Sequence, residues 1–145
     1  MNPSVIATIV LGSSGLLITL IYNYHSSKLS KDKMNKELFT EFNKRYDALN
    51  DILEEIVSKC GSLEELNKYP ELRFKLNDYF NLCAEEYYWY TKKRIDKRIW
   101  DSWEDGMNRW YNKYPVIQEA WKDELDSYGH KTFYMKHGDN LFSKR

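Results

Sequence analysis

The segment from Tyr87 to Trp100, YYWYTKKRIDKRIW, combines aromatic rings with clustered cations. Rings of this kind stack on unpaired bases, and the cations hold phosphates. The side chains that would contact RNA are Lys92, Lys93, Arg94, Lys97 and Arg98. The same pattern fits a helix end at which cations favour the dipole while the rings enter a core or an interface. The 22 basic residues are balanced by 22 acidic ones. Because nucleic-acid-binding domains usually carry a basic excess, we favour the core or interface interpretation and expect no nucleic-acid partner.

No pattern in the sequence indicates catalysis or metal binding. The histidines, His25, His130 and His137, lack the helical spacing that brings ligands together on a metal. Glycine-rich nucleotide loops, the serine-hydrolase pentapeptide and the zinc-protease motif are missing. Neighbouring carboxylates such as Glu85 and Glu86 face different sides of a helix, so we interpret them as solvated or ion-paired. The sequence therefore predicts a protein without enzymatic activity, cofactor or metal.

The first two dozen residues are predicted to cross a membrane. No charged side chain occurs from Val5 to Tyr22, and about twenty apolar residues span a bilayer as a helix. Lysines follow at positions 28, 31, 33 and 36, with Asp32 as the only acid among them. The positive-inside rule then places the N-terminus outside and the remainder of the chain in the cytoplasm. We expect a single-pass protein of the inner membrane, with the lipid bilayer as its first partner.

Small and hydroxyl-bearing residues share one side of this predicted helix. At about 100° per residue, the following six fall within a stripe roughly 100° wide: Ser4, Thr8, Gly12, Gly15, Thr19 and Asn23. Small residues let helix backbones approach, and hydroxyl groups can bond across helices. The stripe therefore predicts a dry face for homo-oligomerisation or the wet lining of a lumen in a ring of helices. A further interpretation is that such residues are simply common in membrane helices. The sequence leaves all three open.

The remainder of the chain is predicted to form an all-α cytoplasmic bundle of about four to five helices, because apolar residues recur at steps of three and four. We divide the chain into a transmembrane helix (1–25), a juxtamembrane linker with a long amphipathic helix (26–60), a helical bundle (61–129) and a C-terminal tail (130–145). Capping and stop signals set the helix ends: Ser30, Gly61, Ser62, Pro70, Asp96, Pro115 and Gly129. The tail is expected to be either an ordered strap or a loose end.

Aromatic residues make up 16% of the chain, and such rings suit both helix cores and protein interfaces. The candidates for an interface with a partner protein are Tyr87, Trp89, Tyr90, Trp100, Trp103 and Trp110. Cys60 and Cys83 are expected to be small core residues rather than a disulfide pair. If the aromatic surface docks a partner, the protein is a membrane-tethered interaction module.

The stretch from Leu76 to Trp121, LNDYFNLCAEEYYWYTKKRIDKRIWDSWEDGMNRWYNKYPVIQEAW, resembles a pattern in small bacterial proteins with one N-terminal membrane helix and a short helical domain. The layout of the whole chain also resembles the single-pass membrane accessory proteins of RNA-targeting type VI CRISPR systems. This resemblance implies a HEPN-like helical domain, assembly into a membrane pore, and a role in antiphage defence beside a defence-system protein. In HEPN ribonucleases a histidine follows an arginine at short spacing, and no such pair exists here. The implied role is therefore a pore, with a degenerate RNA-binding domain as an alternative.

Overall fold

The structure, a computed structural model, describes the backbone of residues 2–142 and the side chains of that range except those of residues 5–14. Thr8 and Gly12 of the predicted stripe thus lie outside the described side chains. Within the described range the fold is all-α, with five α-helices, one 3-10 helix and no strand, as predicted. The chain divides into two compact units, Met1–Lys36 and Glu37–Arg145. Each unit is described by itself.

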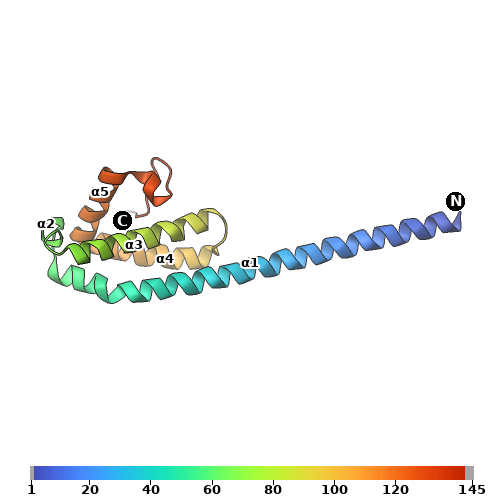
Figure 1. The fold of residues 1–145 in the computed structure, drawn as a ribbon, viewed down its shortest axis with the longest axis horizontal. Coiled ribbons are helices and arrows are strands. Elements are labelled where there is room, and N and C mark those ends of the chain that lie inside the picture. Colours follow the sequence, from blue (N-terminus) through green and yellow to red (C-terminus); the bar gives the residue numbers. More distant parts are fainter. Residues whose placement is uncertain (1, 143–145) are drawn as a thin grey trace. The chain divides into compact units, whose positions relative to one another are not determined.

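The first helix, α1 (Pro3–Lys59), runs through the boundary between the two units (Figure 1). The prediction that a new helix begins at Ser30 is wrong, since that residue lies inside α1. The physical reason is that no glycine or proline occurs between Gly15 and Gly61, so nothing breaks the backbone hydrogen bonding. The part of α1 in the second unit buries Phe42, Leu53 and other apolar side chains.

The predicted capping box is confirmed at the start of α2 (Leu63–Leu66). The Ser62 hydroxyl accepts a hydrogen bond from the backbone N–H of Glu65 at 3.3 Å. The Glu65 carboxylate in turn accepts one from the N–H of Gly61 at 2.6 Å. Pro70 then opens α3 (Pro70–Thr91) as predicted, because its fixed φ and missing N–H suit the first turn of a helix.

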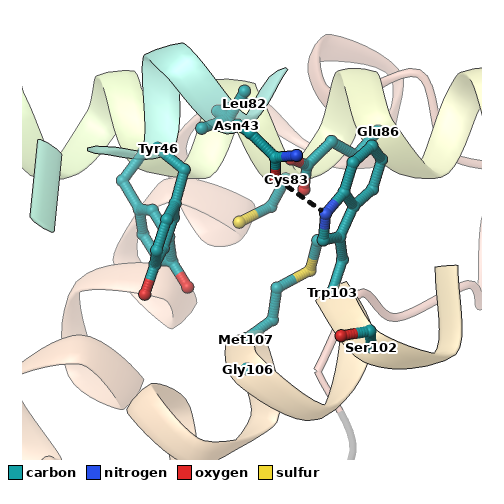
Figure 2. A pocket seen from close by; sticks show the side chains of 10 residues that line it. Asn43, Tyr46, Leu82, Cys83, Glu86, Ser102, Trp103, Gly106 and Met107 are labelled. Atoms are coloured by element: carbon teal, nitrogen blue, oxygen red, sulfur yellow. Dashed lines mark hydrogen bonds between the residues drawn. The ribbon is translucent and has the colours of Figure 1, made fainter. Parts of the chain in front are cut away.

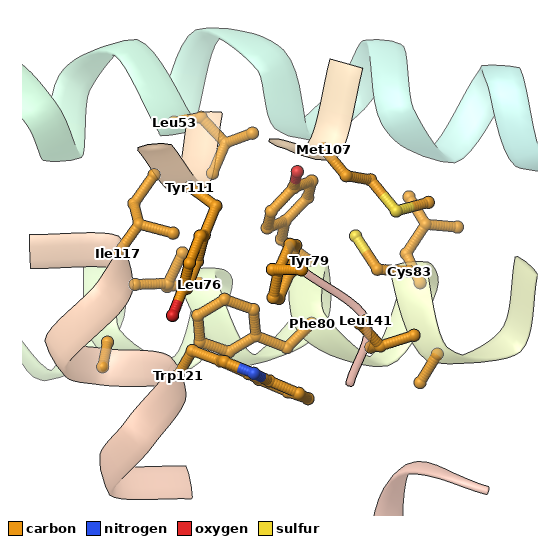
Figure 3. Close-up of a cluster of buried hydrophobic side chains, with 14 of the residues drawn as sticks. Leu53, Leu76, Tyr79, Phe80, Cys83, Met107, Tyr111, Ile117, Trp121 and Leu141 are labelled. Atoms are coloured by element: carbon orange, nitrogen blue, oxygen red, sulfur yellow. The ribbon is translucent and has the colours of Figure 1, made fainter. Parts of the chain in front are cut away.

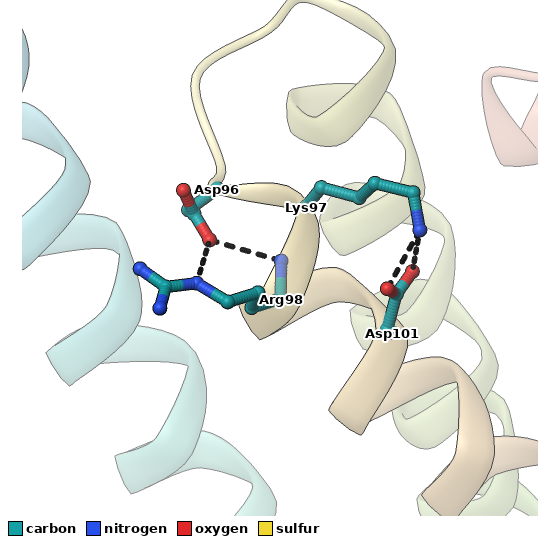
Figure 4. Close-up of polar contacts among 4 residues, drawn as sticks. All are labelled: Asp96, Lys97, Arg98 and Asp101. Atoms are coloured by element: carbon teal, nitrogen blue, oxygen red, sulfur yellow. Dashed lines mark hydrogen bonds and ion pairs between the residues drawn. The ribbon is translucent and has the colours of Figure 1, made fainter.

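Two further helices complete the second unit, α4 (Lys97–Lys113) and α5 (Pro115–Tyr128). Asp96 caps α4 as predicted, and its carboxylate accepts a hydrogen bond from the N–H of Arg98 at 2.9 Å (Figure 4). Gly129 ends α5 with a φ of 76°, a conformation that costs glycine nothing. The short 3-10 helix η1 (His130–Phe133) follows at once.

The core of the second unit is built around aromatic rings (Figure 3). Ring centroids of Trp121 lie 5.1 Å from Phe80, 4.8 Å from Phe133 and 5.2 Å from Phe142. Leu141 is also buried in the tail segment. Of the two predicted alternatives for the tail, its described part is therefore an ordered strap that packs on the bundle.

Polar contacts between helices fix how the bundle is assembled. An ion pair of 2.6 Å joins Arg73 on α3 to Glu124 on α5, and both side chains are largely buried. On the other side of α3, the Arg45 guanidinium of α1 contacts the Glu85 carboxylate at 2.6 Å. The indole N–H of Trp103 on α4 donates to an α1 side chain as well. These directional bonds select one arrangement of helices among those that apolar packing alone allows.

The Asp96 cap can be tested by substitution. We expect Asp96→Ala to lower the free energy of unfolding by about 1 kcal/mol, because the N–H of Arg98 loses its acceptor. Urea unfolding of the full chain in detergent, followed by circular dichroism, measures the change. The matched control is Asp101→Ala, which removes only a solvent-exposed ion pair with Lys97. An equal loss in both variants would contradict the capping role.

Candidate functional site

Four members of the predicted stripe have described side chains: Ser4, Gly15, Thr19 and Asn23. All four are exposed. The Thr19 hydroxyl donates to the carbonyl of Gly15 at 2.8 Å, so it is bonded within its own helix. A β-carbon added at Gly15 would meet no atom within 4 Å. The described part of the stripe is therefore open to a neighbouring helix.

Apolar side chains of the same stretch of α1 are also uncovered. Leu16, Leu17, Ile18, Leu20 and Ile21 are between 58% and 69% exposed. At about 100° per residue they cover about 200° of the helix circumference, and Gly15, Thr19 and Asn23 lie on the remaining side. Water disfavours an apolar surface of this width, which is ordinarily buried against protein or lipid. This stretch of the first unit consequently requires a covering that the chain itself does not supply in the described residues.

A search of the described residues finds no helix that is both long enough and apolar enough to cross a membrane. The predicted transmembrane helix over residues 1–25 is therefore not confirmed. Residues 5–14 of that prediction lie outside the described side chains.

The predicted RNA-contacting cations lie at the turn from α3 to α4: Lys92, Lys93, Arg94, Lys97 and Arg98. Two of them are already engaged by acids. Lys97 contacts Asp101 at 2.6 Å, and Arg98 contacts Asp96 at 3.4 Å (Figure 4). A phosphate would have to compete with these carboxylates. The geometry of the turn accordingly gives the RNA interpretation no added support.

The predicted interface aromatics lie in the core or pack against it: Tyr87, Trp89, Tyr90, Trp100, Trp103 and Trp110. Trp100 is only 4% exposed and stacks on Tyr90 with centroids 4.9 Å apart. Trp110 donates its indole N–H to the Tyr46 hydroxyl of α1 at 3.0 Å. These rings therefore join α4 to α3 and to α1, and because five of the six are half-buried, only part of their surface remains for a partner protein.

A cavity of about 210 Å³ opens among α1, α3 and α4 in the second unit, and sequence reasoning missed it (Figure 2). Its described lining combines aromatic, apolar and polar side chains: Asn43, Tyr46, Tyr79, Leu82, Cys83, Glu86, Ser102, Trp103, Gly106 and Met107. The Asn43 carbonyl accepts the indole N–H of Trp103 at 3.2 Å, which fixes both side chains at the wall. No lysine, arginine or histidine is among these described lining residues.

Glu86 is the most unusual member of the lining, since its carboxyl is only 5% exposed. Its neighbour Glu85 is ion-paired as interpreted from the sequence, but Glu86 is neither solvated nor ion-paired, and for it the interpretation is wrong. Burial raises the pKa of Glu86 to about 8, with Arg45 opposing the shift and Glu85 adding to it. At neutral pH the carboxyl is therefore mostly protonated. The helical spacing did contain a signal, because Glu86 follows the core residues Tyr79 and Cys83 on one face of α3.

Tyr79 and Cys83 add polar groups to the cavity lining but no reactive nucleophile. The Tyr79 hydroxyl has no hydrogen-bond partner, although the residue is only 1% exposed. Burial raises the pKa of the Cys83 thiol well above its ordinary value, so the nucleophilic thiolate is disfavoured. Among the described residues, no group of three or more His, Cys, Asp or Glu could hold a metal ion. The arrangement suits binding of a small molecule better than covalent catalysis.

The buried carboxyl of Glu86 makes stability depend on pH. In the unfolded chain this group ionises near its ordinary pKa of 4.5, whereas in the fold it holds its proton up to about pH 8. Its stabilising contribution is thus complete below pH 4.5 and is lost as the pH rises toward 8. We expect the unfolding free energy of the wild type, relative to Glu86→Gln, to fall by about 1.4 kcal/mol per pH unit in that window. Urea unfolding of both proteins at several pH values measures this, and parallel curves would contradict it.

No family model matches the chain, and no curated protein or solved structure matches it either.

Proposed function

We propose that this chain is a non-enzymatic, membrane-anchored helical protein that self-associates through its N-terminal helix. The observation that carries the proposal is the broad uncovered apolar surface of α1, which spans more than half of the helix circumference and is formed by Leu16, Leu17, Ile18, Leu20 and Ile21. The sequence extends this character toward the N-terminus, because no lysine, arginine, aspartate or glutamate precedes Lys28. Lipid suits a broad apolar surface, and a neighbouring helix suits the side that carries the small residues.

The residues after this stretch support an orientation. Tyr22 and Tyr24 are 71% and 68% exposed, and tyrosine is enriched where a membrane meets water. The lysines that follow, beginning with Lys28, are also exposed. Their positive charge favours the cytoplasmic side of a bacterial inner membrane. On this proposal the second unit lies in the cytoplasm and the N-terminus outside.

The open face at Gly15 and Thr19 supports association between copies of α1. Close approach of helices in lipid depends on small residues, and among the described residues no side chain beyond its chain neighbours comes within 4 Å of a β-carbon added at Gly15. A ring of such helices would permeabilise the membrane. Antiphage defence beside a CRISPR system is the cellular role that the resemblance to type VI accessory proteins implies.

The alternative is a membrane-tethered module that docks a partner protein. Exposed aromatic side chains on the second unit favour it, namely Phe74, Tyr128 and Tyr134, which are 57% to 68% exposed. Aromatic side chains are enriched in protein interfaces. This alternative differs from the leading proposal in needing no contact between membrane helices.

Replacing Gly15 separates the two proposals. We expect Gly15→Leu to reduce the full-length protein in lipid nanodiscs from a discrete assembly to smaller species, because the leucine would hold neighbouring backbones apart. Among the described residues, its β-carbon meets no atom within 4 Å beyond the chain neighbours and the adjacent helix backbone, so we expect the helix to tolerate it. Native mass spectrometry or mass photometry reports the size.

The matched control is Leu17→Phe, which adds bulk on the opposite side of α1 from the stripe. It should leave the assembly unchanged. A wild-type protein that is monomeric at every lipid ratio would overturn self-association and leave the tethered module as the account of the function.

A further inference from the structure

The cavity among α1, α3 and α4 is unused by membrane anchoring or self-association. A volume of about 210 Å³ corresponds to roughly seven waters at about 30 Å³ each. That space suits a molecule of a few non-hydrogen atoms. The cavity lies wholly within the second unit, where α3 and α4 contribute most of its lining. Binding in this cavity therefore does not depend on what covers the part of α1 in the first unit.

Three features of the lining define the chemistry of an occupant. The rings of Tyr46, Tyr79 and Trp103 border the space, and aromatic faces attract cations (Figure 2). The Glu86 carboxyl is the only acidic side chain of the described lining, and no ion pair or hydrogen bond reaches it from another described side chain. A buried carboxyl without a partner is costly unless something else compensates for it.

The nearest cation of the chain does not fill this role. Arg45 acts on Glu86 only at a distance, because its guanidinium is bonded to both carboxylate oxygens of Glu85, at 2.6 and 3.3 Å. The remaining titratable groups around the carboxyl are Tyr46 on α1 with Tyr79 and Cys83 on α3, while α4 places no titratable side chain in the described lining. The site thus combines one unpaired acid with several rings and no competing base.

We propose that this cavity binds a small organic ammonium ion between the Glu86 carboxylate and the surrounding aromatic rings. The ammonium supplies the charge partner that Glu86 lacks, and the rings hold its alkyl groups. Because Glu86 is protonated in the empty site, binding releases its proton to solvent, so charge balances: one cation enters and one proton leaves.

Choline is the probe, since its quaternary ammonium cannot titrate. The full-length protein in a maltoside detergent is titrated by calorimetry in two buffers of different ionisation enthalpy at pH 7. We expect about one proton to be released per choline bound, and an affinity that rises about tenfold per pH unit from pH 6 to pH 7. The neutral carbon analogue, 3,3-dimethyl-1-butanol, should bind at least about tenfold more weakly.

Two substitutions test whether choline binds in this cavity. Glu86→Gln keeps the shape but removes the charge, and it should abolish both the proton release and the preference for choline. Gly106→Leu fills the space from α4, where an added β-carbon meets no atom within 4 Å, and it should prevent binding while the fold is retained. Gly106→Ala is the position-matched control with a smaller side chain, and it should bind choline better than the leucine variant.

The proposal is overturned if choline gives no heat of binding at millimolar concentration, if its neutral analogue binds as tightly, or if folded Gly106→Leu still binds it. None of these results bears on self-association in the membrane, which rests on a different unit of the chain.

Discussion

The packing of Trp121 is the interaction on which the second unit depends. This side chain is only 1% exposed, and it contacts rings from α3, from η1 and from the C-terminal strap. Segments that lie far apart in the sequence therefore meet on one indole. Phe80 lies on α3 about 1.7 turns before Glu86, so the contact that holds α3 in the core also positions the acid at the cavity. The strap closes the cluster, because Phe142 stacks on Tyr111 with centroids 4.8 Å apart.

Two features of the chain break the ordinary division between a dry interior and a wet surface. In the second unit a carboxyl at Glu86 is buried without a charge partner, and its proton compensates for the missing cation. In the first unit the opposite holds, since five apolar side chains are uncovered: Leu16, Leu17, Ile18, Leu20 and Ile21. Departures of this kind tend to mark function, because a sequence selected for stability alone would remove them. For each we propose a partner outside the chain, a small cation in one case and lipid with neighbouring helices in the other.

Local signals in the sequence predicted most of the helix ends, because caps act over a few residues. Asp96, Pro70 and the capping box at Ser62 all behave as expected. The prediction of a helix start at Ser30 was wrong, because a serine can cap a helix only where the preceding chain is not helical. The cavity could not be predicted, because its walls come from three helices whose register is set by tertiary packing. Glu86 was interpreted as solvated or ion-paired together with its sequence neighbour Glu85, although its spacing along α3 placed it among core residues.

Amide hydrogen exchange can test whether lipid covers the apolar stretch of α1. The full-length protein is reconstituted in lipid vesicles, and exchange is followed by mass spectrometry on peptides from α1. Amides of residues 5–22 should exchange orders of magnitude more slowly than those of residues 26–36, although both belong to the same helix, because water is excluded from the bilayer core. Equal exchange in the two stretches would contradict a membrane anchor.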